Sequence, residues 1–236
     1  MFALAQTGQY RVYALDFWGF GDSTKGVTSS FAIKSYVEMV NQFMESLGIV
    51  SAPVAGHSMG GTVALQLALS HPERIRKVAV VGSPVVGSSL NFFLKLAGYG
   101  WIAQLVWQYP LILSTIMRLL LARDSKNVRQ MIFRDVQRAS LESFFRSIGD
   151  LRETNLVGEL PALCIPILGI YGVRDNIVSP ANGHILSRCV NAAQITWMEH
   201  SRHFPMADQP DRFLQTLTAF LNDAEVPSAD QTGNQA

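Results

Sequence analysis

The sequence is short of several residue types, and each shortage narrows the class of protein. Charged residues make up only 16% of 236 residues and the net charge is +1, so we expect no nucleic-acid partner. The two cysteines, Cys164 and Cys189, lie far apart and match no metal-ligand spacing, which predicts two buried free thiols. The first residues lack the pattern of a secretory signal, which predicts a cytoplasmic location.

Hydrophobic residues are plentiful, at 48% of the chain, and favour a folded domain with a continuous core. One apolar stretch, residues 101–117, approaches the roughly 20 residues of a membrane span. Two glutamines and a proline interrupt it, and Arg118 follows. We therefore expect a buried or lid helix pair there, with contact at a membrane surface as the weaker alternative. The tail, residues 223–236, is polar and is expected to be disordered.

Strand-like and helix-like segments alternate along most of the chain. Runs typical of strands occur at residues 11–17, 51–58, 76–81, 166–173 and 193–199. Apolar residues at helical spacing separate most of these runs, which predicts a mostly parallel sheet with helices on both faces. Residues 87–160 contain no strand candidate. The sequence thus predicts an α/β core in two parts, 1–86 and 161–222, with a helical insertion between them.

The motif GHSMGG, residues 56–61, follows one predicted strand and precedes a helix. In a G-x-S-x-G turn of this kind, the serine lies on a sharp, strained bend that exposes its Oγ. The residues two before and two after the serine must be small to avoid a collision, and here they are Gly56 and Gly60. Met59 would offer its backbone N–H to an oxyanion. Ser58 is therefore the candidate nucleophile. The alternative is an incidental serine in an ordinary glycine-rich turn.

A serine nucleophile needs a base, and the base needs an acid to orient it. Among five histidines, His203 is the best candidate because it follows the last predicted strand on a loop that leads into a helix; His200 is the alternative. His57 is expected to pack or to form hydrogen bonds, directed away from Ser58. Asp175, at the end of the preceding predicted strand, is the candidate acid. The chain order Ser, Asp, His is diagnostic of one class of hydrolase.

Four motifs together resemble the α/β-hydrolase superfamily over residues 9–222. LDFWGFGDS is similar to its strand and turn, GHSMGG to its nucleophile elbow, GVRD to its acid loop and HFPMADQP to its histidine segment, with Asp208 in place of glutamate. The resemblance implies that Asp16, Gly19 and Gly21 shape a turn beside the active site. It also implies that the helical insertion is a lid over the pocket. No metal or cofactor is expected.

The resemblance implies a serine hydrolase that forms an acyl-enzyme. Ser58 would attack a carbonyl, His203 would carry the proton and Asp175 would orient His203. A serine at the elbow argues against dehalogenase or epoxide hydrolase chemistry, which needs a carboxylate nucleophile. The lid's apolar character favours a small apolar ester or related acyl substrate. Its aromatic residues, most of them expected in the lid core, are Phe92, Phe93, Trp101, Trp107, Tyr109, Phe144 and Phe145.

One part of the family pattern is missing from the sequence. Members normally place two or three strands and a loop, often His-Gly, before the segment at residues 11–23. That loop supplies a second oxyanion donor, and its strand lies between those ending at Asp16 and His57. We therefore expect an N-terminally truncated fold: a fragment, an impaired short form, or a chain whose neighbour supplies the strand. The alternative function is a non-catalytic binding protein of the same fold, and the oligomeric state stays open.

Overall fold

The computed structural model describes residues 2–25, 30–97, 99, 115, 124 and 126–223. The strands are β1 (Ala52–His57), β2 (Ile75–Val81), β3 (Ile167–Gly172) and β4 (Ala193–Met198). The helices are α1 (Phe2–Gln6), α2 (Ile33–Ser46), α3 (Met59–Ser70), α4 (Phe92–Ala97), α7 (Lys126–Gln137), α8 (Leu141–Glu153), α9 (Ala181–Cys189), α10 (Pro205–Asp208) and α11 (Pro210–Leu221). Short 3-10 helices lie at Pro72–Arg74, Gly87–Ser89 and Leu160–Ala162.

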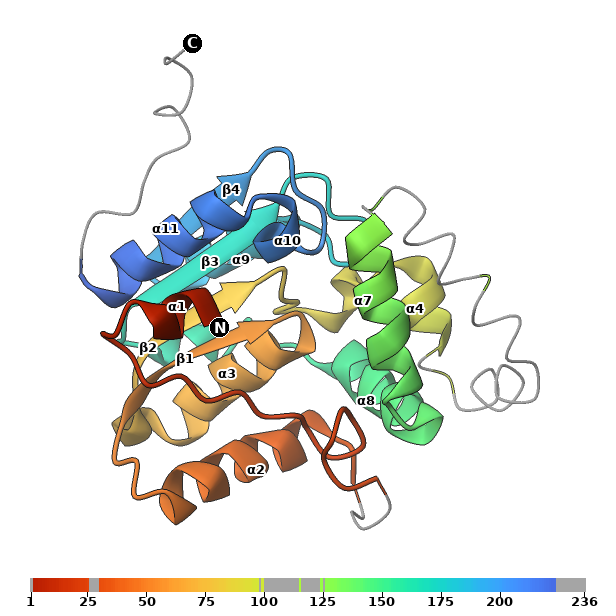
Figure 1. Cartoon of the computed structure of the whole chain (residues 1–236), viewed down its shortest axis with the longest axis horizontal. Helices are drawn as coiled ribbons and strands as arrows, with labels where there is room; N and C mark the ends of the chain where they lie inside the picture. Colours follow the sequence, from red (N-terminus) through yellow and green to blue (C-terminus); the bar gives the residue numbers. More distant parts are fainter. Residues whose placement is uncertain are drawn as a thin grey trace.

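The four strands form one sheet in the order β1-β2-β3-β4, and every neighbouring pair is parallel. Helix α3 connects β1 to β2, and α9 connects β3 to β4, as parallel neighbours require. The carboxyl ends of the strands point towards α4, α7 and α8 (Figure 1). The α/β architecture predicted from the sequence is confirmed, and the residues that follow the strands meet at one edge of the sheet.

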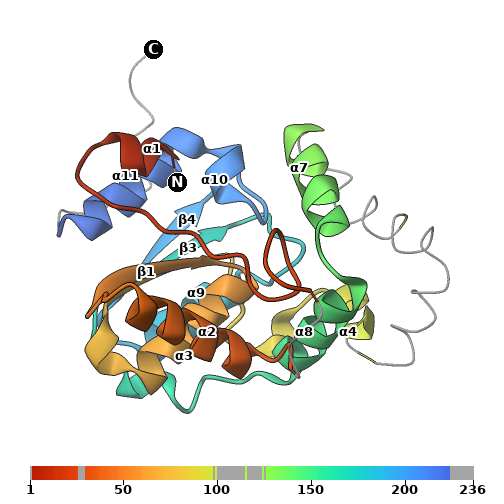
Figure 2. The ribbon, with the colours of Figure 1, turned by 60° about the horizontal axis from the view of Figure 1, so that its bottom comes forward.

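Strand residues alternate between two hydrophobic cores, one on each face of the sheet. Val78 and Val80 belong to the core that α2, α3 and α9 cover. Ala79 and Val81 belong to the core that α11 covers with Leu217 and Phe220. Because successive side chains of a strand point to opposite faces, both faces of β2 are buried. Figure 2 shows α2 and α3 below the sheet and α11 above it.

The strand predicted at residues 11–17 does not form, and this prediction was wrong. The segment is irregular and most of its side chains are exposed. β1 pairs with β2 alone, so its other edge carries no strand in the described sheet and residues 11–17 form no ladder with it. Its aromatic side chains pack on α2 instead: Tyr13 contacts Phe43 with ring centroids 5.6 Å apart, and Phe17 stacks on Tyr36 at 4.5 Å.

The turn after this segment has the shape that the resemblance implied. Gly19 and Gly21 have φ of 87° and 52°, a backbone conformation that favours glycine. Asp16 Oδ2 accepts a hydrogen bond from the backbone N–H of Asp22 at 2.9 Å, which closes the turn. The Gly19 carbonyl accepts from the backbone N–H of Ser140 at 2.7 Å. The turn is thereby held against the start of α8.

Between β2 and β3, the regular structure of the described residues is helical. Phe145 of α8 is 5% exposed and belongs to the core, as expected, whereas Phe92 of α4 is 63% exposed. Phe144 contacts Phe145 edge to face. Three of the predicted lid aromatics, Trp101, Trp107 and Tyr109, lie outside the described residues. The side chain of Phe93 is not described either.

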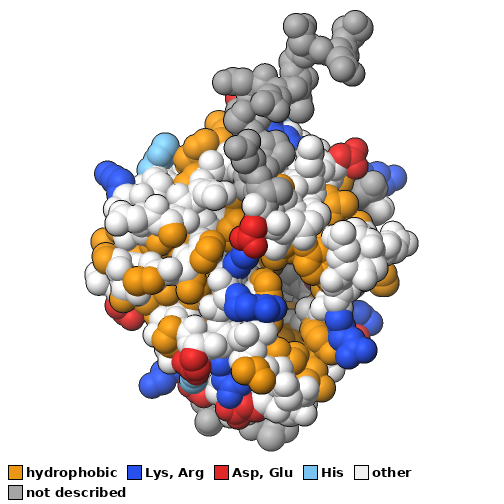
Figure 3. Space-filling view, turned by 90° about the vertical axis from the view of Figure 1, so that its left-hand side faces the viewer, with side chains coloured by type: hydrophobic (Ala, Val, Ile, Leu, Met, Phe, Trp, Pro, Cys, Tyr) orange, Lys and Arg blue, Asp and Glu red, His pale blue; other side chains and the backbone are white. Residues whose placement is uncertain are grey.

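The apolar stretch at residues 101–117 also lies, except for Thr115, outside the described part of the chain. Within the described part, no helix is both long enough and apolar enough to cross a membrane. Both cysteines are free thiols, but Cys164 is exposed and Cys189 only partly buried, so the expected burial was wrong. Figure 3 shows the surface of the molecule at the amino ends of the strands. Positively and negatively charged side chains are interspersed there with hydrophobic ones.

Candidate functional site

The turn between β1 and α3 holds Ser58 in a backbone conformation that is rare for a residue with a Cβ. Ser58 has φ 53° and ψ −124°, which strains the backbone and persists only where the surroundings enforce it. Its backbone N–H donates to the carbonyl of Val81 at 2.8 Å, which ties the turn to the end of β2. Met59 is the first residue of α3, so its N–H has no acceptor within the helix.

The glycines of the turn differ in what they make room for. A Cβ on Gly56 would lie 2.1 Å from the carbonyl oxygen of Gly60, and one on Gly61 would lie 1.9 Å from Ser83 Oγ. A Cβ on Gly60 would meet nothing within 4 Å. The expected need for a small side chain therefore holds at Gly56 but not at Gly60. The second close approach belongs to Gly61, where α3 packs against the end of β2.

Asp175 and His203 are in direct contact at the carboxyl edge of the sheet. His203 Nδ1 lies 2.8 Å from Asp175 Oδ2, and the two side chains are 4% and 1% exposed. The other carboxylate oxygen, Oδ1, accepts from the backbone N–H groups of Ile177 and Val178 at 2.8 and 2.9 Å. Asp175 is thus fixed by its own loop and fixes the His203 ring in turn. His200, the alternative base, is exposed.

His57 connects the Ser58 turn to the loop that carries His203. Its Nε2 lies 2.7 Å from the backbone carbonyl oxygen of His203. Because a carbonyl oxygen only accepts, Nε2 carries the proton. Burial, followed by the nearby charge of His203, lowers the pKa of His57 to about 3. The sequence predicted a packing or hydrogen-bonding role for His57, but its acceptor lies 146 residues away along the chain and no local pattern indicates it.

The contact between His57 and His203 also relates Ser58 to His203. His57 immediately precedes Ser58, and its ring centroid lies 4.7 Å from that of His203. No hydrogen bond joins Ser58 Oγ to His203 among the described residues. Such bonds are often long in enzymes without substrate and shorten when substrate binds.

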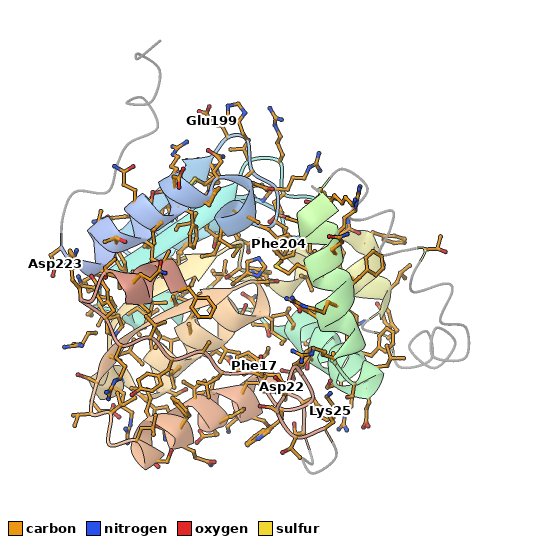
Figure 4. The ribbon with its side chains drawn as sticks, viewed as in Figure 1. Phe17, Asp22, Lys25, Glu199, Phe204 and Asp223 are labelled. Atoms are coloured by element: carbon orange, nitrogen blue, oxygen red, sulfur yellow. The ribbon has the colours of Figure 1, made fainter. Side chains whose placement is uncertain are left out.

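Two further residues shape the site and were missed in the sequence. Gly82 follows β2 with φ 52°, and a Cβ there would lie 3.2 Å from His203 Nδ1 and 3.4 Å from Asp175 Oδ2. Phe204 contacts the rings of His57 and His203 at 4.9 and 5.1 Å, and it lies between the sheet edge and α7 (Figure 4). Glycine after a strand was the only sequence signal for Gly82, and Phe204 gave none beyond its place beside His203.

Comparison with known proteins agrees with this fold. Residues 1–157 match the family described as the alpha/beta hydrolase fold. The match covers more than half of the chain, which therefore belongs to the α/β-hydrolase family. The resemblance inferred from the four motifs is confirmed.

Named relatives in this family are hydrolases and esterases. A 2-hydroxymuconate semialdehyde hydrolase of Pseudomonas putida is 26% identical over 92% of this chain and 78% of its own length. A pimeloyl-[acyl-carrier protein] methyl ester esterase of Aeromonas hydrophila is 28% identical over 92% of this chain and 87% of its own. Among solved structures, a hydrolase from Pseudomonas aeruginosa superimposes with a TM-score of 0.79 at 21% identity, covering 92% of this chain and 82% of the other. These relatives support hydrolase activity.

Proposed function

We propose that this chain is a serine hydrolase that cleaves an ester or related acyl substrate through Ser58, His203 and Asp175. The observation that carries the proposal is the 2.8 Å contact between His203 Nδ1 and Asp175 Oδ2, at the same sheet edge as the strained Ser58 turn. A buried carboxylate held by two backbone donors, an imidazole bonded to it and a serine on a strained elbow are the parts that acyl transfer requires.

The chemistry follows from the atoms present. Asp175 accepts the Nδ1 proton of His203, which leaves Nε2 free to take the proton of Ser58 Oγ. The oxygen attacks the substrate carbonyl, and the backbone N–H of Met59, at the start of α3, stabilises the oxyanion that develops. His203 then gives the proton to the leaving alcohol. Water, activated by the same imidazole, releases the acyl group from Ser58.

Apolar groups around His203 support a largely apolar substrate. The Phe204 ring packs edge to face on the His203 ring, with centroids 5.1 Å apart, so an aromatic side chain adjoins the candidate base. Apolar walls with few polar groups are typical of small-molecule sites and exclude water from the reaction. We therefore expect short-chain and medium-chain esters to be substrates without a metal or cofactor.

The alternative function is a binding protein that keeps the fold without catalysis. One observation favours it: Ser58 Oγ makes no hydrogen bond with His203 among the described residues. Turnover decides between the two, because binding alone leaves esters intact.

Hydrolysis of 4-nitrophenyl acetate, butyrate and octanoate tests the proposal. Ser58→Ala and His203→Gln should each abolish turnover above background. Asp175→Asn should lower kcat by a factor on the order of 10³–10⁴, because an amide holds the wrong tautomer. His200→Gln is the matched control, since His200 lies three residues from His203 but is exposed, and it should retain full activity. Turnover that survives Ser58→Ala would overturn the assignment.

A further inference from the structure

Asp124 is a buried carboxylate without a hydrogen-bond partner among the described residues. It lies two residues before α7, and its side chain is only 6% exposed. Neither Oδ1 nor Oδ2 forms a hydrogen bond. Burial of an unpaired carboxylate costs free energy, because water no longer solvates the charge and no protein group replaces it. A folded protein keeps such a group only where another requirement outweighs this cost.

The position of Asp124 relates it to the candidate site. The first turn of α7 lies beside α10 in both ribbon views (Figures 1 and 2), and α10 directly follows the loop that carries His203. Burial raises the pKa of Asp124, and the charges of Arg202, Asp208, His203 and Asp175 all act on it. The Asp124 carboxyl group is therefore within electrostatic reach of the acid and base of the proposed triad.

None of the described positive groups that act on Asp124 forms a hydrogen bond with its carboxylate. Arg202 is the largest favourable charge acting on it, yet it makes no hydrogen bond to either carboxylate oxygen. The backbone N–H of Arg202 donates instead to Asp208 Oδ2 at 2.8 Å. His203 directs Nδ1 to Asp175. Both carboxylate oxygens of Asp124 thus lack a hydrogen-bond partner among the described residues.

We infer that Asp124 is a substrate-binding residue whose carboxylate accepts a hydrogen bond from an O–H or N–H group that the substrate carries apart from its scissile carbonyl. This inference rests on the proposed function, since it places the reacting carbonyl at Ser58 and His203. It narrows the substrate class. A wholly apolar ester would leave the buried carboxylate unpaired, whereas a hydroxy-ester or amino-ester would supply the missing donor.

A structural role makes a different prediction for the same residue. If Asp124 stabilised the fold, its carboxylate would have a partner, and removal would lower the melting temperature. The described contacts give it none. Asp124→Leu should therefore leave the melting temperature unchanged or raise it, because an apolar side chain avoids the cost of burying the carboxylate.

Matched ester pairs test the inference directly. On the acyl side these are ethyl butyrate, ethyl 3-hydroxybutyrate and ethyl 3-aminobutyrate; on the alcohol side they are butyl acetate and 4-hydroxybutyl acetate. The wild-type protein should prefer the donor-bearing member of at least one set by about tenfold or more in kcat/KM, as expected for a hydrogen bond to a charged group. Comparison of hydroxyl with ammonium distinguishes a neutral donor from a cationic one.

The variants Asp124→Leu and Asp124→Asn assign that preference to the carboxylate. Asp124→Leu should reduce this preference to within about twofold, and Asp124→Asn should retain part of it through its carbonyl oxygen. Asp135→Asn is the matched control, because it removes an exposed carboxylate from α7 and should change nothing. A preference that survives Asp124→Leu, or that is absent from the wild type, would overturn the inference.

A binding measurement separates this inference from the proposed function. The same esters are titrated by calorimetry into Ser58→Ala protein, with and without Asp124→Leu. If no ester is hydrolysed by the wild type, the proposed function fails, yet tighter binding of a donor-bearing ester that Asp124→Leu abolishes would still support the role of Asp124. Equal binding of donor-bearing and plain esters would overturn it.

Discussion

His57 Nε2 donates a hydrogen bond to the backbone carbonyl of His203 across 2.7 Å. This bond joins the residue before the candidate nucleophile to the candidate base itself. It fixes the loop that holds His203 relative to the end of β1, independently of the contact between His203 and Asp175. His57 therefore holds together two parts of the candidate site that lie far apart in the chain.

His57→Phe should lower kcat with little change in KM, because it keeps the ring but loses the N–H that holds the His203 loop. The expected reduction is about five- to tenfold, the value of one neutral hydrogen bond. His57→Gln, which restores an N–H donor, should recover part of the loss. Steady-state kinetics with a 4-nitrophenyl ester provides both constants. Unchanged kcat in His57→Phe would show that the bond does not position the base.

His57 should also make stability depend on pH. Its pKa is about 3 in the folded protein, against an ordinary value of 6.5. Between these values the unfolded chain binds a proton that the folded protein does not, so the free energy of unfolding falls as pH decreases from 6.5 towards 3. The contribution is at most about 1.4 kcal/mol per pH unit.

His57→Gln removes this proton and should flatten the pH dependence of stability over the same interval. Urea unfolding at pH 7, 6, 5 and 4 measures it, with His184→Gln in α9 as the control. Parallel curves for the wild type and His57→Gln would show that His57 titrates normally in the folded protein.

Gly56 and Gly60 should respond differently to the same substitution. Gly56→Ala drives a Cβ to within 2.1 Å of the Gly60 carbonyl oxygen, and we expect a loss of stability of about 1–3 kcal/mol or failure to fold. Gly60→Ala places its Cβ in open space and should change stability by less than about 1 kcal/mol. Thermal unfolding of both variants checks this, and equal losses would contradict the geometry of the turn.

The sequence indicated that the candidate site residues lie close together, but it did not indicate which segments join the sheet. The motifs around Ser58, Asp175 and His203 lie next to strand ends, and parallel strands bring such ends to one edge, so their proximity follows from local patterns. The segment at residues 11–17 has the composition of a strand, yet strand formation needs a neighbour that composition does not supply. Tyr13 and Phe17 therefore pack on α2.

Three features of the site were beyond sequence reasoning. The acceptor of His57, the close approach of Gly82 to the His203–Asp175 pair and the unpaired Asp124 carboxylate all depend on how loops meet in three dimensions. Gly60 shows the reverse error: a glycine that fits the motif meets no steric demand, whereas its neighbour Gly61 does.

Covalent labelling tests directly whether Ser58 is a nucleophile that His203 activates. The purified chain is treated with a fluorophosphonate, which reacts with a serine only where a base activates it, and the adduct is located by mass spectrometry. We expect an adduct on Ser58 that is absent from Ser58→Ala and strongly reduced in His203→Gln. A folded protein without an adduct on Ser58, or one labelled equally in His203→Gln, would contradict the proposed nucleophile and base.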